Sequence, residues 1–191
     1  MAGIDTSKVT VVPITTGPEA LAAGDVDAYM GFSTEAPALV QALGIEPAWF
    51  TLQDYGYGYY VNVYTVRKED LEDTAKRDLI KRLLKADLEG QLAMIKDPDA
   101  AAQLTVDLHG DELGLTLDSE EFTATEASKL FYSPTTEEKG IGYMGGDEMT
   151  VAMKTLNMIL GTDMPLDGSG YVDMSLLDEI HAEDPDFGKL P

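Results

Sequence analysis

An α/β fold is predicted for this chain by two observations. Over residues 1–54, short runs of β-branched and aromatic residues alternate with helical segments, an order that is typical of a parallel sheet covered by helices. From residue 67 onward the hydrophobic residues follow helical periodicity instead. With 191 residues, of which 44% are hydrophobic, the chain is long enough and apolar enough to bury a core.

The first 54 residues are expected to form strand, helix, strand, helix and strand in that order. The β-branched run at residues 8–14 predicts the first strand, in which Pro13 suggests a sheet edge. A short helix over residues 16–23 is closed by Gly24, and a second strand covers residues 26–32. A helix over residues 36–43 stops at Gly44, and the residues around 49–52 predict the third strand.

The corner between the second strand and the second helix is a candidate binding site. Ser33, Thr34 and Glu35 offer capping groups there, and Pro37 suits the first helical turn. Open α/β sheets bind ligands beyond the carboxyl ends of their strands, beside helix N-termini. An ordinary strand-to-helix corner explains the same spacing, so the spacing alone leaves both interpretations open.

Residues 54–66, DYGYGYYVNVYTV, combine glycines, tyrosines and an alternating pattern. The glycines predict a bend or a close approach of the backbone. The alternation predicts a long strand with Tyr59, Val61 and Val63 on one face and Tyr60, Asn62 and Tyr64 on the other.

Helices are expected over the rest of the chain. The pair Asp97 and Pro98 predicts the start of a helix that covers residues 100–108, and Asp118 with Glu121 resembles a capping box. A further helix ends at Gly161, and a last short one covers residues 174–181. Two apolar stripes are expected to form core faces: Leu79, Ile80, Leu83, Leu84, Leu88, Leu92 and Ile95 on one helix, and Met149, Ala152, Met153, Leu156 and Leu160 on another.

Charge and composition exclude several classes of function. The chain has 13 basic and 35 acidic residues, and its net charge of -22 would repel nucleic acid and anionic membrane surfaces. The absence of cysteine excludes disulfides, thiolate nucleophiles and iron–sulfur clusters. His109 and His181 are most simply surface residues, and no dinucleotide, phosphate-loop or EF-hand pattern is complete. We therefore expect no enzymatic activity, no cofactor, no metal site and no nucleic-acid partner.

The remaining functional signal is aromatic and polar. Flat rings with a few hydrogen-bonding groups are how a pocket holds a small, planar, polar molecule. The Glu35 carboxylate could accept paired N–H bonds from an amino-substituted heterocycle, or it could act only on the helix start. The best candidates for ligand contact are Glu35, Tyr57, Tyr60 and Asn62, with Tyr29 and Phe32 as supporting walls.

Several long stretches resemble one family of proteins. They are PEALAAGDVDAYMGFSTEAPALVQALGI, DYGYGYYVNVYTVRKEDLED, DLIKRLLKADLEGQLAMIKDPDAAAQL and the helix after GIGYMGGDEM. Together they are similar to the substrate-binding proteins of ABC importers in the nitrate/sulfonate/taurine and thiamine-pyrimidine-precursor superfamily. The resemblance covers nearly the whole chain.

This resemblance implies a periplasmic-binding-protein-like II fold that is incomplete. Residues 1–54 would be part of the second α/β lobe, residues 55–66 a strand that returns through the hinge, and residues 67–191 the helical C-terminal part of the first lobe. By this resemblance, we expect the opening strands of the first lobe and an export signal to lie outside this sequence. The resemblance further implies a small-molecule ligand, a membrane permease as partner and an extracytoplasmic location for the full-length protein.

The ligand and the class of function have alternatives. Within the superfamily, the tyrosine-rich segment and the GFSTEAP corner resemble the branch that carries thiamine pyrimidine precursors or riboflavin-type compounds more than the nitrate, sulfonate or taurine binders. An enzyme of pyrimidine synthesis on the same fold is a second possibility, which the lack of cysteine disfavours. A third is a homo-oligomer that covers the surface left by the missing N-terminal part.

Overall fold

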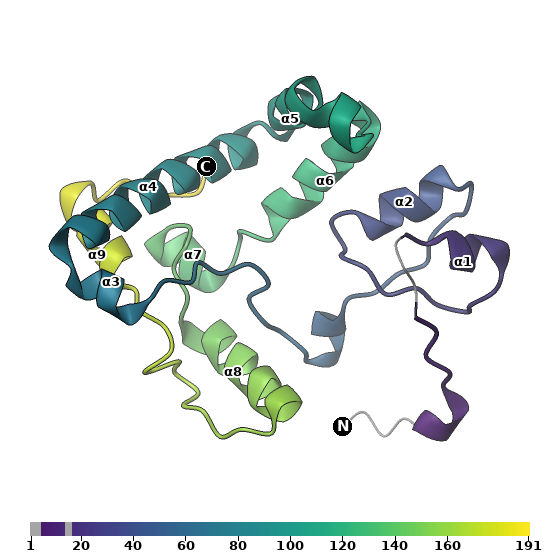
Figure 1. The fold of residues 1–191 in the computed structure, drawn as a ribbon, viewed down its shortest axis with the longest axis horizontal. Coiled ribbons are helices and arrows are strands. Elements are labelled where there is room, and N and C mark those ends of the chain that lie inside the picture. The colour runs from purple at the N-terminus through teal and green to yellow at the C-terminus, as the bar shows by residue number, and fades with distance from the viewer. Residues whose placement is uncertain (1–4, 14–16) are drawn as a thin grey trace. The chain divides into compact units, whose positions relative to one another are not determined.

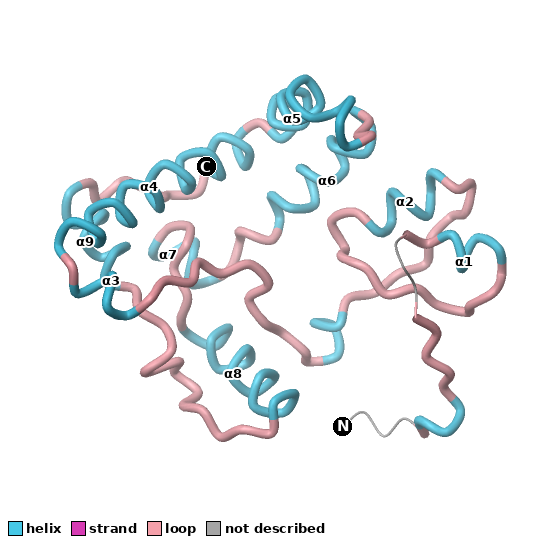
Figure 2. The backbone as a smooth tube through the Cα atoms, viewed as in Figure 1, coloured by secondary structure: helices cyan, strands magenta, loops and turns pink. Residues whose placement is uncertain are grey.

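The computed structural model describes residues 5–13 and 17–191. The chain divides into two compact units, Met1–Trp49 and Phe50–Pro191. The described part of the chain is mostly helical, and no strand occurs in it (Figure 2). None of its helices combines the length and the apolar composition that crossing a bilayer requires.

The first unit contains the 3₁₀ helix η1 (Thr6–Lys8) and the helices α1 (Glu19–Ala23) and α2 (Ala36–Ala42). Both predicted helices are confirmed. Helix α1 begins later than residue 16, which lies outside the described residues, and Gly24 closes the helix in the left-handed conformation. Pro37 lies in the first turn of α2 and is buried together with Val40. The expectation that Ser33, Thr34 or Glu35 caps α2 is wrong, because Glu35 holds the N-cap position without a side-chain hydrogen bond.

The predicted strands are wrong wherever the structure describes them. Residues 8–13, 26–32 and 59–66 have no ladder, and residue 14 lies outside the described residues. Leu52–Tyr55 forms the 3₁₀ helix η2, because Thr51 and Asp54 make a reciprocal capping box across its start. An extended segment becomes a strand only when a neighbouring segment pairs with its backbone, and β propensity does not supply that neighbour.

The second unit is built from seven α-helices besides η2, over the described residues 50–191. They are α3 (Lys68–Glu72), α4 (Thr74–Lys96), α5 (Pro98–Leu113), α6 (Leu117–Lys129), α7 (Pro134–Lys139), α8 (Gly146–Leu160) and α9 (Ser175–Glu183). Helices α4, α5 and α6 pack on one another, α9 packs on α4, and α7 contacts α8 (Figure 1).

Local capping chemistry sets most of the helix boundaries in this unit. Asp97 accepts a hydrogen bond from the Ala100 backbone N–H at 3.1 Å, so α5 begins at Pro98 as predicted. The predicted cap of α6 is wrong, because Thr116 and Ser119 form its capping box and Asp118 lies inside the first turn. Helix α8 ends at Leu160, with Gly161 as its left-handed C-cap as predicted, and α9 begins one residue after the predicted start of the last helix.

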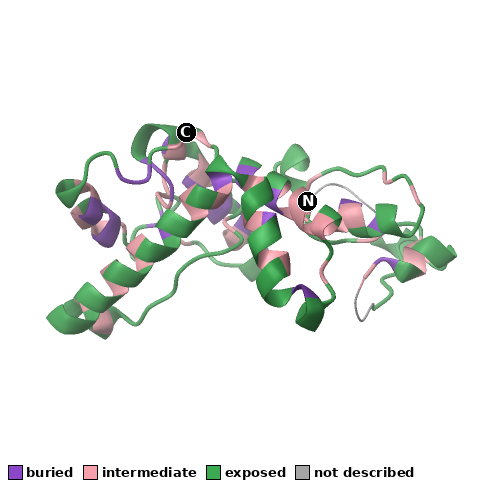
Figure 3. Cartoon of the chain, turned by 90° about the horizontal axis from the view of Figure 1, so that it is seen from above, coloured by how far each residue is buried: buried purple, intermediate pink, exposed green. Residues whose placement is uncertain are grey.

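The core of the second unit lies between α4, α9, the segment that follows α7 and the C-terminal tail. Figure 3 colours the residues of the chain by their burial. Its buried members are Leu88, Ile95, Ile141, Leu177, Ile180 and Phe187. The apolar stripe predicted on α4 is only partly correct, because Leu79 and Leu83 are 57% and 68% exposed. Each lies one residue, or about 100° around the helix, from the partly buried positions 80 and 84.

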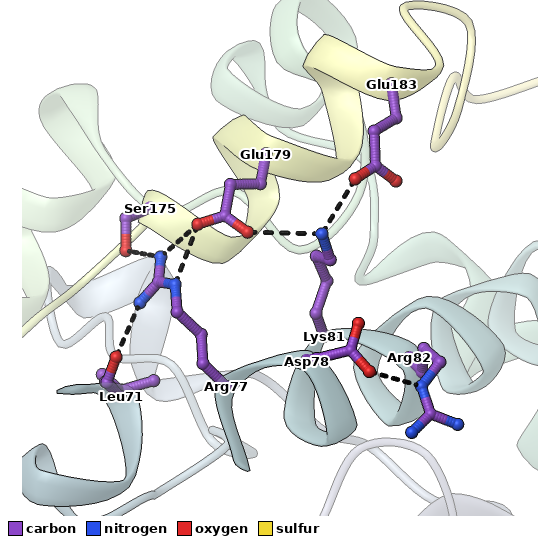
Figure 4. Close-up of polar contacts among 8 residues, drawn as sticks. All are labelled: Leu71, Arg77, Asp78, Lys81, Arg82, Ser175, Glu179 and Glu183. Carbon is purple, nitrogen blue, oxygen red and sulfur yellow. Dashed lines mark hydrogen bonds and ion pairs between the residues drawn. The ribbon is translucent and has the colours of Figure 1, made fainter. Parts of the chain in front are cut away.

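A polar network joins α4 to α9 beside this core (Figure 4). The Arg77 guanidinium donates to the Glu179 carboxylate at 2.8 Å and to the Ser175 hydroxyl at 2.8 Å. Lys81 lies 3.4 Å from Glu179 and 2.8 Å from Glu183. The network thus ties two helices that are about one hundred residues apart in the sequence.

Arg77→Met is expected to lower the free energy of unfolding by about 1 kcal/mol, because the variant keeps the apolar stem but loses charge-assisted bonds that solvent partly screens. Denaturant titration at low and at high salt measures the loss, which should shrink as salt screens the charges. Arg82→Met is the matched control, since its partner Asp78 lies on the same helix and both side chains are exposed. An equal loss for the two variants would show that the link between helices adds nothing.

Candidate functional site

The residues predicted to contact a ligand lie in both units. Tyr29, Phe32 and Glu35 belong to the first unit, and Tyr57, Tyr60 and Asn62 belong to the second. The structure therefore describes two separate groups of candidates.

In the first unit the candidates form the turn that leads into α2. Tyr29 is half-buried and packs against Gly31, where an added Cβ would lie 2.8 Å from the Tyr29 ring and 2.8 Å from the Ala36 side chain. Phe32 is exposed, and its carbonyl accepts hydrogen bonds from the backbone N–H groups of Glu35 and Ala36 at 3.2 and 2.8 Å. The Glu35 carboxylate is exposed at the start of the helix. This turn places an aromatic ring and an exposed carboxylate within a few residues of each other.

In the second unit Tyr60 is the candidate with a defined polar partner. Its hydroxyl accepts a hydrogen bond from the Gly145 backbone N–H at 3.3 Å, immediately before α8. Burial raises the pKa of Tyr60, and the negative charge of Glu148 adds to that effect. Tyr57 is half-buried and Asn62 is exposed, and neither side chain makes a hydrogen bond to a described residue.

Glu148 and Thr135 lie beside the contact between Tyr60 and Gly145, and the sequence analysis identified neither residue. The Glu148 carboxylate accepts hydrogen bonds from the Thr135 hydroxyl at 3.0 Å and from its backbone N–H at 3.3 Å. Burial favours the neutral carboxyl, but these bonds and its own backbone N–H outweigh burial and lower the pKa of Glu148. The ionised carboxylate is also favourable in the first turn of α8. The run GGDE at residues 145–148 was the sequence signal that could have indicated Glu148 as a functional residue.

A second feature is a hollow between the end of α7, α9 and the tail. Its volume is about 330 Å³, and it is lined by Glu138, Lys139, Tyr143, Asp178, His181, Pro185 and Lys189. The interpretation of His181 as a surface residue is wrong, since it is half-buried with its ring edge-on to Tyr143 and Phe187. Its Nε2 is buried and has no hydrogen-bond partner among the described residues. The hollow has the size of a small polar ligand and carries both signs of charge.

Polar groups beside the hollow interact with one another. The hydroxyl of Tyr143 donates to the Asp178 carboxylate at 2.9 Å, and Lys139 lies 5.8 Å from the centre of the Tyr143 ring. No group of three or more histidine and carboxylate side chains in residues 5–13 and 17–191 is arranged to hold a metal ion.

Ionisation of Tyr143 is expected to lower the stability of the second unit at alkaline pH. Burial and the hydrogen bond to Asp178 raise its pKa from 10.0 to about 12. The folded state therefore favours the neutral phenol, so this stabilisation is present below pH 10.0 and is lost as the pH rises through about 12. Tyr143→Phe is expected to flatten that loss in denaturant titrations at increasing pH. Phenolate absorbance, recorded during the same pH series, tests whether the ionising group is Tyr143.

Tyr64→Phe is the matched comparison, because burial and Asp87 also raise the pKa of Tyr64 to about 12. Each variant should remove part of the alkaline loss of stability, and the double variant should remove more than either. A Tyr143→Phe protein whose stability falls as steeply as that of the parent would contradict the assignment.

Comparison with known proteins gives one match. A family model described as NMT1/THI5 like matches residues 1–101. No curated protein and no solved structure matches the chain. The matched residues include the turn with Tyr29, Phe32 and Glu35 and the segment with Tyr57, Tyr60 and Asn62. The chain belongs to the NMT1/THI5-like family, which is part of the nitrate/sulfonate/taurine and thiamine-precursor binding proteins.

Proposed function

We propose that the chain is the substrate-binding component of an ABC importer and that it binds a small, planar, polar compound such as a thiamine pyrimidine precursor or a riboflavin-type molecule. The observation that carries the proposal is the family match over residues 1–101, because it includes both groups of candidate residues. The family consists mainly of binding proteins, which are usually periplasmic or extracytoplasmic. The proposed partner is therefore a membrane permease.

The proposal assigns ligand contacts to six residues: Glu35, Tyr57, Tyr60, Asn62, Tyr29 and Phe32. The exposed Glu35 carboxylate would accept two N–H bonds from an amino-substituted ring, and the aromatic rings would stack on its faces. Residues 1–54 would then belong to the second lobe of the periplasmic-binding-protein-like II fold, residues 55–66 to the hinge and residues 67–191 to the first lobe.

Calorimetric titration with aminopyrimidines and with flavins tests the ligand class. We expect one class to bind and Glu35→Ala to weaken that binding by about tenfold or more, the loss for a charged partner left unpaired. Glu46→Ala is the control, because Glu46 is an exposed acid of the same unit. If Glu35→Ala and the parent bind the ligand with equal affinity, the assignment of Glu35 to the ligand site is wrong.

The same titration separates the alternatives. Binding of nitrate, a sulfonate or taurine, with no response to either heterocycle, would favour the other branch of the family. Consumption of a heterocyclic ligand in the presence of added iron would indicate an enzyme of pyrimidine synthesis. If no ligand binds, an oligomeric interaction protein is the remaining candidate, favoured by the exposed apolar side chains of residues 59–66.

A further inference from the structure

The Tyr60 hydroxyl differs from those of Tyr64 and Tyr143 in the direction of its hydrogen bond. Those two hydroxyls donate to carboxylates of the second unit, Asp87 and Asp178. The Tyr60 hydroxyl instead accepts from the backbone N–H of Gly145 at 3.3 Å, and it donates to no described residue. A phenol has one hydrogen to donate, and the described part of the chain leaves that of Tyr60 unused.

The carboxylate of Glu148 does not take this hydrogen. Burial raises the pKa of Tyr60, and the negative charge of Glu148 raises it further. The Glu148 oxygens accept instead from the hydroxyl and the backbone N–H of Thr135, at 3.0 and 3.3 Å. Tyr60 therefore stays protonated at neutral pH, and its half-buried hydroxyl gains most from a partner that supplies an acceptor.

Gly145 leaves the backbone beside this hydroxyl without a side chain. Its φ of 167° is extended backbone that any residue adopts, and an added Cβ would have only the Thr135 methyl group within 4 Å, at 3.9 Å. At Gly58, two positions before Tyr60, an added Cβ would lie 3.0 Å from Val151. Packing explains the glycine at position 58, whereas a molecule that approaches position 145 meets no side chain there.

We propose that the Tyr60 hydroxyl donates a hydrogen bond to an acceptor atom of the bound heterocycle, a ring nitrogen or a carbonyl oxygen. This inference rests on the proposed function and adds a rule of selection to it, since a ring without an acceptor leaves the hydroxyl unpaired. The Gly145 N–H holds the phenol oxygen in place before the ligand arrives, so little freedom is lost on binding. An aminopyrimidine carries both the N–H groups that Glu35 would accept and the ring nitrogens that Tyr60 requires.

Calorimetric titration with 4-aminopyrimidine, aniline and riboflavin tests the role of Tyr60. Aniline keeps the aromatic ring and the amino group but has no ring nitrogen. The parent is expected to prefer 4-aminopyrimidine to aniline by about tenfold or more, and Tyr60→Phe should lose that preference. Riboflavin has carbonyl acceptors, so it should bind Tyr60→Phe about tenfold more weakly than the parent. Tyr59→Phe is the control, because Tyr59 is 49% exposed and outside the proposed site.

The outcomes separate this inference from the proposed function. If Tyr60→Phe keeps the preference for 4-aminopyrimidine, or binds riboflavin as tightly as the parent, the inference is wrong while the proposed function stands. An equal loss for 4-aminopyrimidine and aniline also overturns it, because the bond to Gly145 would then act only on the structure. So does an equal loss in Tyr59→Phe. A parent that binds neither heterocycle contradicts both the proposed ligand class and this inference.

Discussion

Leu88→Ala is expected to lower the free energy of unfolding by about 2–5 kcal/mol, the usual cost of removing a large side chain from a close-packed core. Leu88 is 1% exposed and belongs to the cluster formed with Ile141, Ile180 and Phe187. An added Cβ at Gly142 would lie 3.3 Å from a Leu88 methyl group, so that glycine allows the chain to approach the helix closely. The cavity left by alanine cannot collapse easily, because four separate segments meet at this point.

Leu83→Ala on the same helix is the control. Leu83 is 68% exposed, so its truncation should change stability by less than about 0.5 kcal/mol. Urea titrations of parent and variants, followed by helical circular dichroism, measure both values. Similar losses at positions 83 and 88 would mean that α4 presents a different face to the core than the structure describes.

The contrast between these two leucines shows what the sequence could predict. Helix existence followed from local chemistry, such as Asp97 before Pro98 or the glycines at 24, 44 and 161, because a cap needs only residues a few positions away. Which apolar stripe is buried depends on the helices that pack against it. The stripe of Leu79 and Leu83 has the same periodicity as that of Leu84 and Leu88, and only tertiary contacts distinguish them.

The strand predictions were wrong for a related reason. The alternation in residues 59–66 predicted two faces, and this prediction is wrong: the chain bends at residues 61 and 62, and Tyr64 is 56% exposed, as much as Val61 and Val63 at 55% and 50%. Whether such a segment joins a ladder depends on a partner that its own sequence does not specify. The predicted contacts of Tyr60 likewise gave no indication of Gly145, which lies 85 positions further along the chain.

The largest backbone effect is expected at Gly140, which links the core to the hollow beside His181. Gly140 has φ 101° and ψ 164°, a region that essentially only glycine occupies. An added Cβ would lie 3.1 Å from the Gly188 carbonyl oxygen and 3.2 Å from the His181 ring. That carbonyl accepts the Ile141 N–H at 2.8 Å, so the close approach is part of the contact that holds the tail.

Gly140→Ala is therefore expected to cost about 3 kcal/mol or more, the sum of backbone strain and overpacking. Gly114→Ala separates the two causes, because Gly114 also has a positive φ of 67° but no atom within 4 Å of an added Cβ. Its loss should be about 1–2 kcal/mol from conformation alone. Hydrogen exchange at the Ile141 amide should accelerate in Gly140→Ala and not in Gly114→Ala, because only the first substitution pushes the tail away from its carbonyl acceptor. Equal losses of stability in both variants, with unchanged exchange at Ile141, would show that the tail does not depend on this close approach.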